Sequence, residues 1–107
     1  MKRLLVTGGS GYLGRHIARR VAVGWPGEWR YTTFSADPLA LPQGVRLDVR
    51  DGAAVARFVA DFAPDAVIHT AGSNTTPDMT AVIVDGTRHV AEAAARAGAR
   101  LVHLSTD

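Results

Sequence analysis

The chain has 107 residues, 47% of them hydrophobic, which suits a single domain with a packed core. Twelve basic and ten acidic side chains leave a net charge of only +2, and no basic run carries interleaved aromatic residues, so the composition argues against a nucleic-acid partner. Cysteine is absent, which excludes disulfides, thiolate metal sites and cysteine nucleophiles.

The N-terminal apolar run is too short to be a targeting segment. It follows three residues, Met1 to Arg3, and breaks at Thr7, well before the length of a signal-peptide core. No stretch of the sequence approaches the about 18 apolar residues of a membrane span. We therefore expect a cytoplasmic chain with no membrane partner.

A strand, a glycine turn and a helix open the chain. A strand is expected over residues 2–7, whose successive apolar positions Leu4, Leu5 and Val6 are typical of a strand buried on both faces of a parallel sheet. Gly8, Gly11 and Gly14 follow, and a helix is expected over residues 12–23. Glycines at this spacing permit a tight turn, close approach of a pyrophosphate, and close packing of helix on strand. The unpaired N–H groups of the helix start attract phosphate, so the stretch predicts cofactor binding.

The middle of the chain contains two strands in close succession. They are expected over residues 29–35 and 45–49, and about ten residues join them. That link is shorter than the dozen or so residues of a usual crossover helix. Either a loop crosses between two parallel strands, or one strand lies elsewhere. Asp51 is then expected to cap a helix that runs to about Ala63.

The last third alternates strand and helix again. A strand is expected over residues 66–70, a polar loop over 72–78, an alanine-rich helix over 79–97 that ends at Gly98, and a strand over 100–104. The whole pattern predicts an α/β fold, a parallel sheet with helices on both faces and strand order 3-2-1-4-5, truncated after strand five. Ligands of such sheets bind at the carboxyl ends of strands one and four.

Five stretches follow, in order, the pattern of one known family. They are Thr-Gly-Gly-Ser-Gly-Tyr-Leu-Gly at residues 7–14, Leu-Asp-Val-Arg-Asp at 47–51, the strand and Ala-Gly at 64–72, the helix at 84–94, and Leu-Val-His-Leu-Ser-Thr-Asp at 101–107. Together they resemble the extended short-chain dehydrogenases/reductases, the NAD-dependent epimerases and dehydratases. The short link between strands two and three and the Ser-Thr-Asp ending resemble the dTDP-4-dehydrorhamnose reductase branch.

The resemblance implies a Rossmann-like NAD(P)-binding domain over residues 1–107, part of a sugar-nucleotide reductase or epimerase. In the complete protein a hydride would pass between the nicotinamide and a keto-sugar. By the same resemblance the Asp48 carboxylate and Val49 contact the adenine, and Thr106 is the catalytic hydroxyl that holds the substrate carbonyl. The cofactor-binding candidates are Thr7, Gly8, Gly11, Tyr12, Leu13, Gly14, Ser35, Asp48, Val49, Ala71 and Gly72.

Three departures from the family pattern limit what this chain is expected to do. Neither tyrosine, Tyr12 or Tyr31, has a lysine four residues on, so the Tyr-x-x-x-Lys pair is missing. The substrate-binding part is absent, and Ile83 stands where the family usually has Asn. We expect no catalysis by these residues alone. The alternatives are the N-terminal part of a longer enzyme, a non-catalytic NAD(P)-binding sensor or scaffold, and a fragment that binds nothing and self-associates into a homo-oligomer through its unpaired fifth strand.

The choice of cofactor depends on the end of the second strand. Ser35 stands where NAD-preferring members carry an acidic residue, and Asp37 comes two residues later. Ser35 does not repel a 2′-phosphate, and Arg15 or Arg50 could pair with one. The sequence therefore favours NADP over NAD as the cofactor.

Two histidines are expected to have neither a catalytic nor a metal-binding role. His69 is expected in the core or rim of the fourth strand. His89 lies one helical turn before Glu92, but without further converging ligands a solvated helix face is expected there, and no metal site.

Overall fold

The computed structural model describes residues 2–9, 11–34, 37, 39–71 and 77–105, with the backbone alone at 71, 77–82 and 105. The element order is the expected one. The elements are β1 (Leu4–Thr7), α1 (Tyr12–Gly24), β2 (Trp29–Thr33), β3 (Gly44–Arg46), α2 (Gly52–Phe62), β4 (Ala66–Ala71), α3 (Pro77–Arg96) and β5 (Arg100–Ser105).

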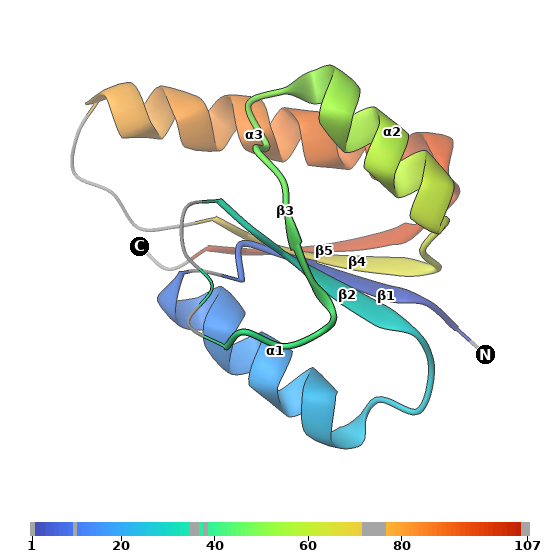
Figure 1. Ribbon diagram of the computed structural model, residues 1–107. Coiled ribbons are helices and arrows are strands. Elements are labelled where there is room, and N and C mark those ends of the chain that lie inside the picture. Colours follow the sequence, from blue (N-terminus) through green and yellow to red (C-terminus); the bar gives the residue numbers. More distant parts are fainter. Residues whose placement is uncertain (1, 10, 35–36, 38, 72–76, 106–107) are drawn as a thin grey trace.

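The strands form one parallel sheet in the order β3-β2-β1-β4-β5, which confirms the predicted topology (Figure 1). β1 lies at the centre, with Leu4 opposite Trp29 of β2 on one side and Ala66 of β4 on the other. The chain reverses its direction of travel across the sheet between β1 and β4. This switch point is where parallel sheets of this kind open a crevice for ligands.

Successive residues of β1 enter two different cores. Leu5 packs with Val55 and Val59 of α2 and with Val90 of α3 on one face of the sheet. Leu4 and Val6 belong to the other core, which includes Ala18 of α1, Trp29 and Tyr31. Figure 1 shows the same division, with α1 on one face and α2 and α3 on the other. Full burial of each such aliphatic side chain contributes about 1.5–3 kcal/mol, so the unbroken apolar run specifies a central strand.

A loop links the two parallel strands β2 and β3, as one of the two interpretations of the sequence required. None of the described residues of the link is helical. The buried Tyr31 organises it: its hydroxyl donates to both Asp37 carboxylate oxygens at 2.9 Å and accepts from the Leu41 N–H at 2.9 Å. The Ala40 N–H also donates to Asp37, at 2.9 Å. An aromatic hydroxyl and one carboxylate therefore replace a crossover helix.

The β3 strand is shorter than predicted. It ends at Arg46 because Asp48 begins a turn, in which the Asp51 N–H donates to the Asp48 carbonyl at 3.0 Å. The predicted cap is confirmed, since the Asp51 carboxylate accepts from the Ala54 N–H at 3.1 Å. Gly98 follows the end of α3 with a positive φ of 68°, a conformation that glycine adopts without strain.

Among the described helices, none combines the length and apolar character that a membrane crossing requires.

Candidate functional site

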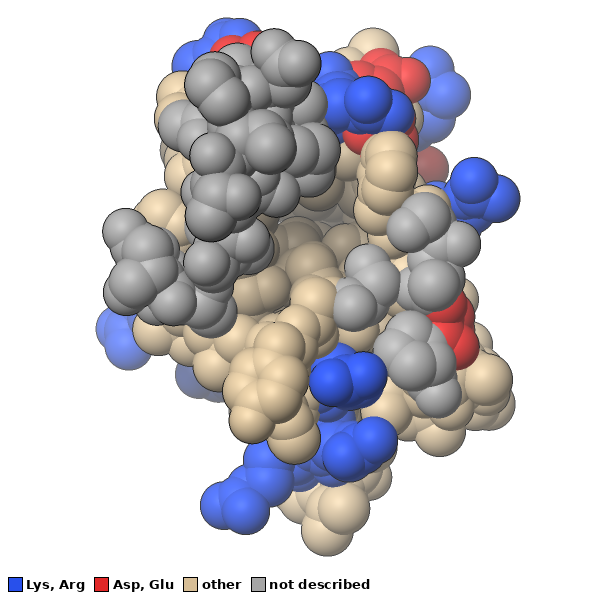
Figure 2. All heavy atoms as spheres, turned by 90° about the vertical axis from the view of Figure 1, so that its left-hand side faces the viewer, with Lys and Arg blue, Asp and Glu red and all other residues tan. Residues whose placement is uncertain are grey.

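The carboxyl ends of the strands lie together at one edge of the sheet, which Figure 2 views face on. A hollow lined by uncharged side chains opens near the centre of this view. Basic side chains gather below it, on the side where α1 lies in Figure 1, and α1 carries Arg15, Arg19 and Arg20. We call this edge, with the β1–α1 turn and the turn after β3, the carboxyl edge.

Close contacts require glycine at several positions of the β1–α1 turn, most severely at Gly8 and Gly14. Gly8 has a positive φ of 78°, and a Cβ there would lie 2.1 Å from the Thr70 hydroxyl oxygen. A Cβ on Gly14 would lie 1.9 Å from the Gly8 carbonyl oxygen. Thr70 of β4 closes the turn from behind by donating to the Thr7 carbonyl at 2.8 Å. The start of α1 therefore packs closely against the end of β1 at the switch point.

Gly11, by contrast, has no close neighbour among the described residues. Of these, a Cβ there would meet only the Gly8 carbonyl oxygen, at an ordinary contact distance of 3.5 Å. Gly11 is the N-cap of α1, makes no side-chain cap bond, and has an extended φ of −82°. The N–H groups of Tyr12, Leu13 and Gly14 therefore have no partner within the helix, and no acidic side chain stands in the first turn. Backbone donors with room in front of them can receive an anion.

The turn after β3 presents a carboxylate held by a single arginine. Asp48 accepts from the Arg50 backbone N–H at 3.0 Å, from Nε at 2.9 and 3.1 Å, and from a terminal nitrogen at 2.8 Å. The hydrogen bond from the Arg50 side chain lowers the pKa of Asp48. The Arg50 guanidinium also lies 4.8 Å from the centre of the Phe34 ring, just after β2. Asp48 is therefore an ionised acceptor beside the ends of two strands.

His89 does not lie on a solvated helix face, so that expectation is wrong. Its half-buried ring donates from Nδ1 to the Val49 carbonyl at 2.7 Å. A Cβ on Gly52 would lie 3.0 Å from the other side of the same ring. The sequence signal for this contact would have been the glycine at the start of α2, which leaves space for an imidazole.

Within the described part of the chain, no group of three or more acidic or histidine side chains is arranged to bind a metal.

His69 is buried behind the β1–α1 turn, as predicted from its place in β4. Its Nδ1 is hydrogen-bonded to the Thr7 hydroxyl and its Nε2 to the Thr87 hydroxyl of α3, at 2.9 Å for the latter. Burial, with a smaller contribution from the charge of His103, lowers the pKa of His69 to about 4. A neutral imidazole therefore bridges β1 and α3. Sequence reasoning placed this residue correctly but did not find the two threonine partners.

The structure brings most of the predicted cofactor residues to the carboxyl edge. Thr7, Gly8, Gly11, Tyr12, Leu13 and Gly14 form one turn, and Asp48 and Val49 form the next. Ala71 ends β4 opposite Ser105 of β5. Ser35, Gly72 and the proposed catalytic Thr106 lie outside the described residues.

Two of the charged groups considered for the cofactor's ribose differ in availability. Asp37 accepts from the Tyr31 hydroxyl, so this acidic group is already engaged inside the link between β2 and β3. Arg50 lies at the carboxyl edge with its side chain about half exposed (51%).

The chain is similar to known proteins over nearly its whole length. Residues 4–107 match the NAD dependent epimerase/dehydratase family. A dTDP-4-dehydrorhamnose reductase of Streptomyces griseus is 37% identical over 98% of this chain and 33% of the enzyme. Bordetella bronchiseptica WbmG, solved with NAD and also with NAD and UDP, superposes with a TM-score of 0.75 at 28% identity in its NAD complex, over 95% of this chain and 36% of WbmG.

A further solved relative is the UDP-glucose 4-epimerase of Thermus thermophilus in complex with NAD. It has a TM-score of 0.77 and 26% identity, over 92% of this chain and 36% of the epimerase. The chain thus spans about a third of the length of the relatives that it matches.

Proposed function

We propose that the chain, which belongs to the NAD-dependent epimerase/dehydratase family, is the dinucleotide-binding portion of a sugar-nucleotide reductase or epimerase. Within that family we favour a dTDP-4-dehydrorhamnose reductase-like enzyme. The S. griseus reductase supports this choice through its 37% identity. The NAD and UDP complexes of WbmG support a dinucleotide cofactor and a nucleotide-sugar substrate.

The observation that carries the proposal is the contrast among the three glycines. Gly8 and Gly14 are required by internal contacts, whereas no contact with the described residues requires glycine at Gly11. An open glycine beside uncapped amides is what a pyrophosphate needs for close approach. In our proposal Gly11 and the first turn of α1 bind the pyrophosphate, and Asp48 and Val49 contact the adenine. Ala71, Gly72 and Ser35 complete the cofactor site.

The proposed reaction requires more than the residues of this chain. A bound nicotinamide supplies the hydride donor or acceptor. The chain's own tyrosines are not placed for proton transfer beside a lysine: Tyr31 is fully buried on Asp37, and Tyr12 is 74% exposed at the start of α1. We therefore expect these 107 residues to bind the cofactor without turnover, with Thr106 contributing its hydroxyl in the complete enzyme.

The experiment that tests the proposal is a fluorescence titration with NADPH and NADH of three proteins. They are the wild type, Gly11→Ala and the control Gly24→Ala, whose added Cβ meets nothing within 4 Å. Gly11→Ala is expected to unfold like the wild type but to bind about tenfold more weakly, a loss of about 1.4 kcal/mol. Wild-type binding that Gly11→Ala leaves unchanged would refute a pyrophosphate at this turn.

A preference for NADP rests on the groups beside β2. Asp37, the nearest described acidic residue after this strand, is engaged by Tyr31, and Arg50 stands over Phe34 with its side chain half exposed. A cation there favours a 2′-phosphate. Arg50→Ala is expected to lower the ratio of NADPH to NADH affinity several-fold, and an unchanged ratio would contradict the assignment.

One alternative from another class is a non-catalytic NAD(P)-binding sensor or scaffold. The missing Tyr-x-x-x-Lys pair favours it. The gene sequence downstream of Asp107 separates the two: a Tyr-x-x-x-Lys motif there supports the enzyme, and an immediate stop codon supports the sensor. The cytoplasmic location and homo-oligomer formation stay predictions, the latter to be tested by sedimentation.

A further inference from the structure

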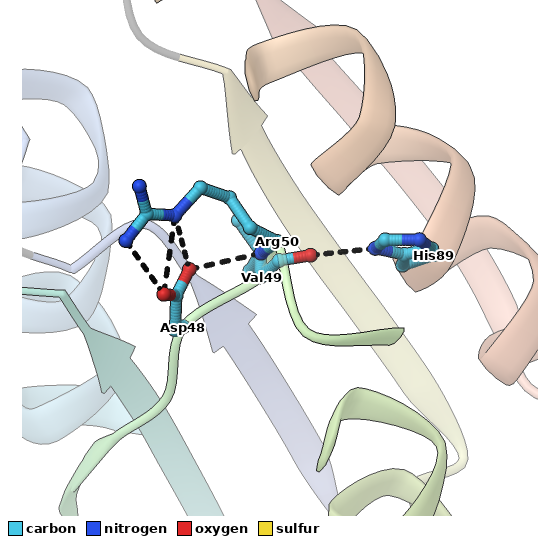
Figure 3. Close-up of polar contacts among 4 residues, drawn as sticks. All are labelled: Asp48, Val49, Arg50 and His89. Atoms are coloured by element: carbon cyan, nitrogen blue, oxygen red, sulfur yellow. Dashed lines mark hydrogen bonds and ion pairs between the residues drawn. The ribbon is translucent and has the colours of Figure 1, made fainter. Parts of the chain in front are cut away.

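A chain of three hydrogen-bonded groups connects α3 to the Asp48 carboxylate. The Val49 carbonyl and the Arg50 N–H are the two ends of one peptide group, and a trans peptide directs them to opposite sides. The carbonyl end accepts from His89 Nδ1 at 2.7 Å. The N–H end donates to Asp48 at 3.0 Å. Figure 3 shows this arrangement, with the peptide between His89 and Asp48.

The imidazole of His89 is itself held on two sides. A carbonyl can only accept, so Nδ1 must carry the hydrogen of this bond. On the opposite side the ring touches Gly52 so closely that a Cβ there would lie 3.0 Å from Cδ2 and Nε2. Gly86, one turn earlier on α3, would place a Cβ 2.6 Å from the Val49 side chain. The turn after β3 is therefore fitted against α3 and is not a free loop.

The Asp48 carboxylate is accessible to a further partner because its side chain is 39% exposed. Arg50 supplies four hydrogen bonds to it, two on each oxygen, and Nε is shared between the two oxygens at 2.9 and 3.1 Å. A ligand donor that approaches from the exposed side can take over the longer, shared Nε contact at one oxygen, which gives the carboxylate an acceptor site for a ligand. The direction of that site depends on the orientation of the carboxylate, and hence on the peptide that holds one side of it.

We infer that His89 is a positioning residue for recognition of the purine: it fixes the Val49–Arg50 peptide, and through it the Asp48 carboxylate, so that the carboxylate accepts from the 6-amino group of adenine. The inference rests on the proposed function, which places adenine at Asp48 and Val49. It adds a residue on α3 that does not touch the ligand and yet determines which purine the site accepts.

The test compares two dinucleotides that differ only in the purine. NADH carries a 6-amino group, and its hypoxanthine analogue carries a carbonyl oxygen there, which the Asp48 carboxylate cannot bind. The wild type is expected to bind NADH about tenfold more tightly than the analogue, since a charge-assisted hydrogen bond is lost and two acceptors face each other. Fluorescence titration gives both dissociation constants.

Three variants of the full chain isolate the role of His89. His89→Leu keeps bulk but has no donor, and its preference for NADH is expected to fall below about threefold. His89→Asn places an amide nitrogen near the position of Nδ1 and is expected to restore most of the preference. Arg88→Ala, on the exposed side of the same helix where Arg88 pairs with Asp85 and Glu92, is expected to leave it unchanged. Thermal unfolding of each variant separates loss of fold from loss of preference.

The outcomes distinguish this inference from the proposed function. A wild type that binds neither dinucleotide overturns both. A wild type that binds both equally overturns the adenine assignment and this inference, and leaves the pyrophosphate site standing. A folded His89→Leu protein that keeps the wild-type preference overturns the positioning role alone, as does His89→Asn behaving like His89→Leu.

Discussion

Acid is expected to destabilise this fold through one buried imidazole. The pKa of His69 is lowered from 6.5 to about 4, mainly by burial, so the folded chain binds fewer protons at this site than the unfolded chain between these pH values. Stability therefore rises with pH across the window and is lost as pH falls from 6.5 towards 4. The limit of the loss, reached below pH 4, is about 3 kcal/mol.

The size of the effect can be stated at an accessible pH. At pH 5 the imidazole is almost fully protonated in the unfolded chain and almost fully neutral in the folded chain. The free energy of unfolding is therefore about 2 kcal/mol lower at pH 5 than at pH 8. Protonation also places hydrogens on both ring nitrogens, which already have the Thr7 and Thr87 hydroxyls as partners. Both hydroxyls can then accept, so the cost is the buried charge and not a lost hydrogen bond.

The assay is urea unfolding of the wild type and His69→Gln at several pH values between 8 and 5. Carboxylates and the other histidines titrate in both proteins, so the difference between the two curves isolates His69. At pH 8 the free energy of unfolding is expected to be larger for the wild type than for the variant. This difference is expected to shrink by about 2 kcal/mol by pH 5. A margin that stays constant across this range would refute the claim that His69 is held neutral by the fold.

Two further changes probe the turn and the link. Gly14→Ala forces α1 away from the Gly8 carbonyl, so both cofactor binding and about 1–3 kcal/mol of stability should be lost in titration and urea unfolding, and wild-type stability would contradict the close approach. Tyr31→Phe leaves the Leu41 N–H and the Asp37 carboxylate without their shared hydroxyl, so the free energy of unfolding should fall by about 1–3 kcal/mol, and an unchanged urea midpoint would show that the hydroxyl does not stabilise the link.

The layout of the sheet could be predicted because its signals are local. The apolar run of β1, the glycine spacing and the Asp51 cap each act within a few residues, and the right-handed crossover rule then orders the strands. The exact end of β3 could not be predicted, because it depends on the turn that Asp48 forms with Asp51. The sequence does not determine the form of the link between β2 and β3 for a similar reason, since the hydroxyl that organises it is ten residues from one of its partners.

The partners of the histidines were beyond sequence reasoning because each contact joins segments far apart in the chain. His69 and Thr7 are 62 residues apart, and His89 and Val49 are 40 apart. A histidine beside polar residues on a helix has the same sequence signature whether its ring faces water or a distant carbonyl. Only the packing of α3 on the turn after β3 decides between them.

Through the contacts of Thr87 and His89, α3 supports both parts of the proposed cofactor site, the β1–α1 turn and the turn after β3. Thr87 reaches His69, which bonds to Thr7 at the start of the phosphate turn, and His89 reaches the peptide that orients Asp48. Since the two α3 residues are only two positions apart on one rigid helix, a shift of that helix would disturb both contacts together. Cofactor affinity should therefore be sensitive to the seating of α3 even though none of its described residues lies in either turn.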